Sequence, residues 1–234
     1  MNPQLSQNSR AVQRFIEEAQ VGAQLQHPNI VPIHDFGTMP DGRYFFTMKE
    51  INGREFSELI QEVHRLDSIQ SESSSSESSL RQLIQIFHSV CETIAFSHSL
   101  KVIHRDLKPE NVMVGRFGEV LVVDWGIAKV LGGESKESIV QTERTAIGAS
   151  QTRYGTVSGT PAYMSPEQAM GRTDLVDERT DIYALGAILY EILSGKPPYV
   201  GSSALDVLEQ VRNSMNTVST DEFIDLPEYQ LTHN

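Results

Sequence analysis

The sequence predicts an α+β fold in which one helix and a few antiparallel strands come before a mostly helical region. Near the start, apolar residues recur at helical spacing, at Val12, Phe15, Ile16, Ala19 and Ala23. Two short runs of strand-forming residues follow, and longer segments with helical periodicity come after them. The 234 residues could form one large domain or two small lobes, and an apolar fraction of 39% suits a globular protein.

The first helix should end before Pro28, because the residue that precedes a proline disfavours helical geometry. Residues 30–36 are predicted to form a strand, and residues 44–48 a second one. Between them, Asp41-Gly42 is typical of a hairpin turn. The two strands are therefore expected to pair in antiparallel fashion.

Two further helices are expected on either side of a serine-rich run. The first is predicted by the spacing of Phe56, Leu59, Ile60 and Val63. Residues 68–79 contain mainly Ser and Glu with almost no apolar content, which predicts a disordered surface insert. The second helix is long and amphipathic, with apolar residues at Leu80, Leu83, Ile84, Phe87, Val90, Cys91 and Ile94.

The second half of the chain combines a hairpin with two more helices. The β-rich runs 112–114 and 120–123 flank a glycine-bearing turn. Residues 181–194 are apolar nearly all round, which predicts a buried helix with Gly195 as its C-terminal cap. A last short helix is indicated by Ala204, Leu205, Leu208 and Val211.

Composition excludes some partners and settings. The net charge of −12 argues against nucleic acid or an anionic membrane surface as the main partner. The most apolar stretch, residues 182–193, is too short to span a bilayer, so no membrane segment is expected in this chain. The single cysteine, Cys91, should be a buried unreactive thiol, and it favours a reducing cytoplasm.

Two motifs carry candidate chemistry. Residues 104–111 read His-Arg-Asp-Leu-Lys-Pro-Glu-Asn, and Asp124-Trp125-Gly126 follows the predicted hairpin. They offer a candidate base, Asp106, and two candidate oxygen ligands for a cation, Asn111 and Asp124. The hairpin should bring both ligands to one edge, and Mg²⁺ prefers oxygen ligands. Further along, residues 159–167 read Gly-Thr-Pro-Ala-Tyr-Met-Ser-Pro-Glu.

On these motifs the chain resembles bacterial, eukaryotic-like serine/threonine protein kinases. The resemblance implies a two-lobed kinase-like fold, with a partial N-lobe at residues 1–51, a mostly helical C-lobe at 52–215 and a polar tail at 216–234. The chain contains neither the glycine-rich loop nor the strand lysine with which the family holds the ATP phosphates. A truncated N-lobe and a shortened C-terminal end are therefore expected.

The resemblance also implies roles in catalysis and cofactor binding. Asp106 would be the catalytic base, and Lys108 would contact the transferring phosphate. Asn111 and Asp124 would be the Mg²⁺ ligands and, with Lys108, would bind Mg²⁺-ATP. His104 would be a histidine packed in the core.

Residues in the first lobe would bind the adenine ring. The backbone groups of Glu50 and Ile51 match the family's hinge, and Met48 would close the back of the pocket. Arg105 would pair with a phosphate on the loop of residues 126–165, whose candidate acceptors are Thr152, Thr156 and Ser158. An unmodified polar loop is an equally open interpretation of those hydroxyls.

The leading hypothesis is a serine/threonine kinase catalytic region that uses ATP and Mg²⁺ and acts on protein Ser/Thr hydroxyls. Two alternatives stay open: a catalytically impaired kinase-like binding or scaffold module, and a fragment of a longer kinase. Asp106, Asn111 and Asp124 favour the enzyme, whereas the missing glycine loop and lysine favour impairment. Transfer by this chain alone is expected to be at least about a hundredfold slower than by a complete kinase.

Overall fold

A computed structural model describes residues 9–67, 73–125, 129–130 and 161–214 of the chain. The helices are α1 (Ser9–Gln24), α2 (Phe56–Asp67), α3 (Ser73–Ser99), α5 (Pro166–Ala169), α6 (Glu178–Ser194) and α7 (Ala204–Asn213). The strands are β1 (Ile33–Thr38), β2 (Tyr44–Met48), β3 (Gly53–Glu55), β4 (Val102–Ile103), β5 (Val112–Gly115), β6 (Val120–Val122) and β7 (Lys129–Val130). Short 3-10 helices are η1 (Pro109–Asn111), η2 (Pro161–Tyr163) and η3 (Thr173–Leu175).

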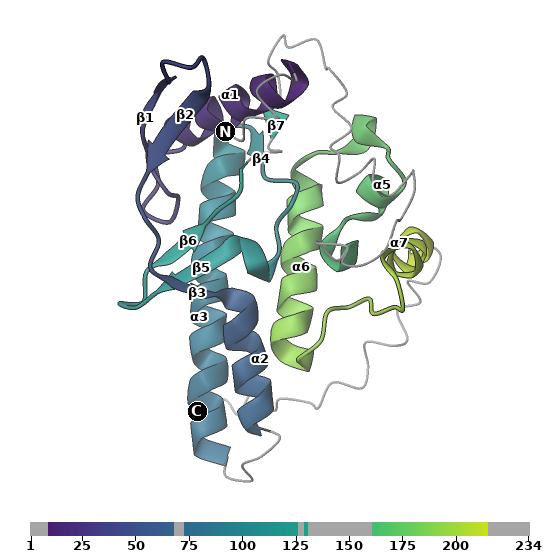
Figure 1. Cartoon of the computed structure of the whole chain (residues 1–234). Helices are drawn as coiled ribbons and strands as arrows, with labels where there is room; N and C mark the ends of the chain where they lie inside the picture. The colour runs from purple at the N-terminus through teal and green to yellow at the C-terminus, as the bar shows by residue number, and fades with distance from the viewer. Residues whose placement is uncertain (1–8, 68–72, 126–128, 131–160, 215–234) are drawn as a thin grey trace.

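Helix α1 and the β1–β2 hairpin lie together at one end of the molecule (Figure 1). Phe15 of α1 packs on Phe46 of β2 with ring centroids 4.8 Å apart. The turn places Gly42 at φ 84°, a conformation that glycine adopts without steric cost. A strand was predicted at residues 30–36, but β1 begins three residues later, at Ile33, and ends at Thr38. Ile30 instead forms an isolated parallel bridge to Val122.

In the described residues the strands form three small sheets, and both predicted hairpins are among their pairings. β1 pairs with β2, β3 with β5 and β5 with β6, and β4 with β7, all antiparallel. The β5–β6 hairpin was expected, but β3, β4 and β7 were not. These three strands have only two or three residues each, which is too short for an alternating pattern to emerge.

The helical region is organised around α3, which packs against both α2 and α6 (Figure 1). Its buried face is mainly apolar, with Thr93 and Ser97 as buried polar side chains, and contributes to a core that includes Phe56, Ile60, Leu83, Val90, Ile94, Val122, Ile188 and Ile192. The prediction of a disordered insert is corrected in part, because α3 already begins at Ser73. Ser and Glu are tolerated in a helix, so the strong amphipathic segment that follows can extend through them. Residues 68–72 lie outside the described part of the chain.

The composition of α6 predicts a helix that is buried on all sides, and this prediction is wrong. Ile182, Tyr190 and Leu193 are 56%, 51% and 53% exposed, and they lie on one side of the helix. Periodicity cannot separate a fully buried helix from one with an exposed apolar stripe. The C-terminal cap is as predicted: Gly195 has φ 76°, and its N–H donates to the Glu191 carbonyl.

These elements confirm the predicted α+β class, with a small strand-bearing region followed by a mostly helical one. Cys91 is free and only half-buried, and burial raises the pKa of its thiol above the usual value. A thiol with a raised pKa is a poor nucleophile, in keeping with the expected lack of reactivity. Across the described residues, no helix combines the length and the apolar character needed to cross a membrane.

Candidate active site

The motif that begins at His104 forms a loop between β4 and η1. The two residues of β4, Val102 and Ile103, are buried and anchor the start of the loop. The His104 ring is fully buried against Trp125, with centroids 4.6 Å apart, as expected for a packed core histidine. Its Nε2 lies 3.1 Å from the Val123 carbonyl, and its Nδ1 lies 3.3 Å from the Asp106 N–H. Since a carbonyl only accepts, this geometry fits a ring with the proton on Nε2.

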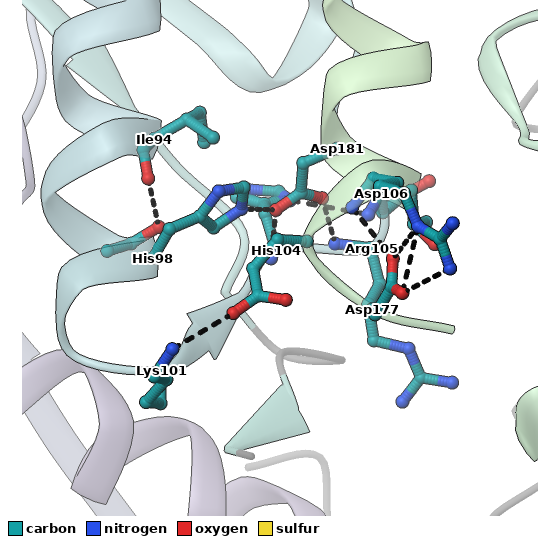
Figure 2. Close-up of polar contacts among 12 residues, drawn as sticks. Ile94, His98, Lys101, His104, Arg105, Asp106, Asp177 and Asp181 are labelled. Atoms are coloured by element: carbon teal, nitrogen blue, oxygen red, sulfur yellow. Dashed lines mark hydrogen bonds and ion pairs between the residues drawn. The ribbon is translucent and has the colours of Figure 1, made fainter. Parts of the chain in front are cut away.

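Asp181, in the first turn of α6, holds the backbone of the same loop (Figure 2). Its Oδ2 accepts from the His104 N–H at 2.8 Å and lies 2.8 Å from His98 Nε2, while its Oδ1 accepts from the Arg105 N–H at 2.9 Å. Burial alone would raise the pKa of this carboxyl, but the bonds from His98 and the backbone outweigh it and keep the pKa below its usual value. Asp181 is therefore an ionised anchor for the loop.

Asp106 is brought together with two other predicted site residues. The Lys108 ammonium donates to Asp106 Oδ2 at 2.9 Å, and the Lys108 side chain is nearly buried. The Asn111 amide donates to the Asp106 carbonyl at 2.7 Å and to Oδ2 at 3.3 Å. A carboxylate and an ammonium thus lie side by side at a half-buried position. This arrangement can accept a proton and stabilise negative charge close to the same point.

The β5–β6 hairpin joins Asn111 to the neighbourhood of Asp124. The Val123 N–H donates to the Asn111 carbonyl at 2.9 Å, so Asn111 lies beside the residue that precedes Asp124. Asp124 is exposed and has φ 62°, in the left-handed region that few non-glycine residues adopt. Such strain is often found at functional sites.

The donor set suits a hard cation. Because the amide nitrogen of Asn111 donates to Asp106, its amide oxygen is the atom left to act as a ligand. In the described residues, no cluster of three His, Cys, Asp or Glu side chains is placed to hold a metal. An amide oxygen and one carboxylate leave most positions to phosphate and water oxygens, which is the coordination that Mg²⁺ prefers. The residues present therefore fit Mg²⁺-ATP.

The three predicted adenine-binding residues lie at the end of β2 and directly after it. Met48 is 53% exposed, Glu50 is exposed and Ile51 is half-buried. They lead directly into β3, which pairs with β5, the strand that follows Asn111. The shared sheet connects the segment after β2 to the β5–β6 hairpin that follows Asn111, and the role of the three residues stays a prediction.

A cavity of about 490 Å³ lies at the end of α1 and the loop that follows it, and it reaches Lys49, between the predicted adenine-binding residues Met48 and Glu50. Its lining includes Leu25, His27, Pro28, Lys49 and Leu121. None of the predicted catalytic, metal-binding or adenine-binding residues lines it.

Comparison with known proteins identifies the family. Residues 2–231 match the protein kinase domain. This chain belongs to the protein kinase domain family. It is 34% identical over 214 residues to the serine/threonine-protein kinase PknD of Protochlamydia amoebophila, covering 91% of this chain and 21% of that protein.

Two further relatives are also serine/threonine-protein kinases named PknD. The chain is 37% identical over 202 residues to PknD of Chlamydia trachomatis serovar D and 38% identical over 199 residues to PknD of Chlamydia caviae. Each match covers 83% of this chain and 21% of the relative. The chain thus spans about a fifth of the length of these curated relatives, so the kinase family is shown for this region.

Sequence reasoning overlooked two residues that hold the backbone of the loop around Asp106, namely Asp181 and Gln168, and one buried side-chain pair. Asp181 was assigned only as the start of an apolar helix, although a carboxylate in such a segment indicates a buried anchor. Gln168 was not singled out, yet Ser165-x-x-Gln168 has the spacing of a capping box, which the structure shows. Tyr163 and Glu191 form a buried hydrogen bond of 2.5 Å between η2 and α6.

Some predicted kinase features lie outside the described residues. These are Gly126 and the loop hydroxyls of Thr152, Thr156 and Ser158. The expected pairing of Arg105 with a phosphate on that loop stays a prediction for the same reason.

Proposed function

We propose that this chain is the catalytic region of a serine/threonine protein kinase, which transfers the γ-phosphoryl group of ATP to protein Ser/Thr hydroxyls. The observation that carries the proposal is the contact of Lys108 and Asn111 with Asp106 within one loop. The PknD relatives, which are named serine/threonine-protein kinases, support the same chemistry.

Each residue has a role that follows from its contacts. Asp106 accepts the proton of the substrate hydroxyl, since its carboxylate is held by Lys108 and Asn111. Lys108 offsets negative charge that develops on the phosphoryl oxygens. Asn111 and Asp124 would hold Mg²⁺ with their oxygens, and bound Mg²⁺-ATP supplies the phosphoryl group. The backbone of Glu50 and Ile51, with Met48 behind, would bind adenine.

The setting and substrates belong to the proposal as well. Cys91 is the single cysteine, which leaves no internal disulfide and favours a cytoplasmic setting. The acidic balance, −12 in formal charge, mildly favours basic protein substrates in signalling.

The test compares Asp106→Asn with the unaltered chain and with Asp174→Asn. Asp174 is an exposed aspartate paired with Arg172, so the same chemical change there should leave transfer intact. Radiolabelled phosphate incorporation into a generic basic protein should fall at least about a hundredfold in Asp106→Asn. Nucleotide binding, measured by calorimetry, should persist in all three proteins. Equal incorporation by Asp106→Asn and the unaltered chain would remove Asp106 from its role.

A further inference from the structure

The residue directly before the candidate base has an unusual backbone conformation. Arg105 has φ 72°, in the left-handed region. A non-glycine residue keeps such a conformation only where the surrounding structure holds it. Its N–H donates to Asp181 Oδ1 at 2.9 Å, and its carbonyl accepts from Gln168 Nε2 at 2.7 Å. Side chains from two separate helices, α6 and α5, therefore hold Arg105 from both sides.

The orientation of the Gln168 amide follows from its partners. Its oxygen lies 3.2 Å from the Ser165 N–H and 3.2 Å from the Ser165 hydroxyl, both of which can donate. Its nitrogen faces the Arg105 carbonyl, which can only accept. Gln168 therefore uses one end to cap α5 and the other to reach the catalytic loop, 63 residues earlier in the chain.

Only the second of these contacts requires glutamine. A capping box works equally well with Glu or Gln at its third position, because either side chain offers an oxygen to the cap N–H. Only the amide can also donate to a backbone carbonyl, since an ionised carboxylate has no hydrogen to give. Replacing Gln168 with glutamate should therefore remove the hydrogen bond to Arg105 and keep the cap of α5.

We propose that Gln168 is a positioning residue for phosphoryl transfer, which fixes the peptide between Arg105 and Asp106 and so aims the Asp106 carboxylate. The inference rests on the function proposed above. The Gln168 amide holds the carbonyl side of Arg105, while Asp181 holds the N–H side. Because the same amide caps α5, it couples the position of α5 to that of the base.

The experiment compares the unaltered chain with Gln168→Glu and Ser165→Ala. Gln168→Glu keeps the cap but loses the donor to Arg105, whereas Ser165→Ala loses the capping hydroxyl and keeps that donor. Gln168→Glu should lower kcat for transfer to a basic protein about tenfold, the equivalent of about 1.4 kcal/mol, with KM for ATP within about twofold. Ser165→Ala should keep kcat within about twofold while its unfolding midpoint falls. An equal loss of kcat in both variants would show that Gln168 acts only as a helix cap.

Amide hydrogen exchange tests the inference independently of activity. In Gln168→Glu, exchange in the segment 104–108 should quicken about tenfold, whereas in Ser165→Ala the change should stay within residues 165–169. If the unaltered chain transfers no phosphate, the proposed function fails, and the exchange result still decides whether Gln168 holds the segment 104–108 in place. Unchanged exchange at 104–108 in Gln168→Glu would overturn it. Should circular dichroism show that this variant is unfolded, Gln168→Met takes its place; because it loses both the cap oxygen and the donor, only a loss of kcat and a quickening of exchange at 104–108 beyond those in Ser165→Ala would support the inference, and equal effects in the two variants would overturn it.

Discussion

Helix α6 carries two buried carboxylates whose pKa values are shifted in opposite directions. Asp181 lies in the first turn, is 0% exposed and has a lowered pKa. Glu191 lies near the other end, is 5% exposed and has a raised pKa. The more deeply buried group is therefore the one that ionises more readily, so depth alone does not decide the charge.

The difference lies in the donors that each carboxylate meets. Burial raises the pKa of both groups, but Asp181 accepts from two backbone N–H groups and is bonded to His98. Glu191 accepts from the Tyr163 hydroxyl, and the negative charge of Glu110 adds to the effect of its burial. At neutral pH one end of α6 thus carries an ionised carboxylate that holds the loop around Asp106, and the other end holds a carboxyl whose charge is destabilised by burial.

The largest effect should come from removing the anion. In Asp181→Ala the N–H groups of His104 and Arg105 lose their acceptor in a buried setting. The free energy of unfolding should fall by about 3–5 kcal/mol, because each unpaired buried donor costs about 1–3 kcal/mol. Guanidinium unfolding followed by circular dichroism measures the loss. Asp181→Asn keeps one acceptor oxygen and should lose less. A loss below about 1 kcal/mol in Asp181→Ala would contradict the anchoring role.

The same contrast shows what the sequence could predict about the site. The motif around Asp106 and the hairpin between Asn111 and Asp124 were predictable, because local residue order sets them. The partners that hold this loop, Asp181 and Gln168, lie 76 and 63 residues from Arg105 in the chain. A single sequence carries no signal for such distant pairings, although the buried charge and the capping-box spacing could have marked both residues.

The fold follows a similar division between local and distant determinants. Helices α1, α2, α3 and α7 were predictable from apolar residues at helical spacing, and α6 from its nearly continuous apolar run. Strands β3, β4 and β7 were not, since two or three residues become strands only through the partner they pair with. The extension of α3 back to Ser73 was missed because composition describes the run by itself and not as the continuation of a strong helix.

A smaller effect is expected at the Glu191 end of α6. Tyr163→Phe removes the hydroxyl that donates to Glu191 and leaves the burial of the carboxyl in place. The free energy of unfolding at neutral pH should fall by about 1–2 kcal/mol, and the pKa of Glu191 should rise further. Tyr190→Phe is the matched control, because Tyr190 lies beside Glu191 on α6 and is 51% exposed, so the same hydroxyl is removed at the surface. The thermal unfolding midpoint of Tyr163→Phe should be lower than that of Tyr190→Phe. Equal midpoints would show that the buried hydrogen bond adds nothing to stability.

The smallest effect should come from Glu191→Gln, and its pH dependence sharpens the comparison most. Glutamine keeps an acceptor for the Tyr163 hydroxyl but cannot ionise, so the stability change should stay within about 1 kcal/mol. The pKa of Glu191 in the folded chain lies above its usual value of 4.5, so the folded state binds more protons than the unfolded state just above that pH. The unaltered chain should therefore lose stability relative to Glu191→Gln as pH rises from about 4.5 through the folded pKa of Glu191, and at higher pH the difference should stay constant.

Asp181→Asn should give the opposite sign. The lowered pKa of Asp181 stabilises the unaltered chain above the usual value of 3.8, and that advantage disappears as pH falls through the folded pKa of Asp181. Urea unfolding at a series of pH values measures both differences, and curves of the same sign for the two variants would refute the contrast between the two ends of α6.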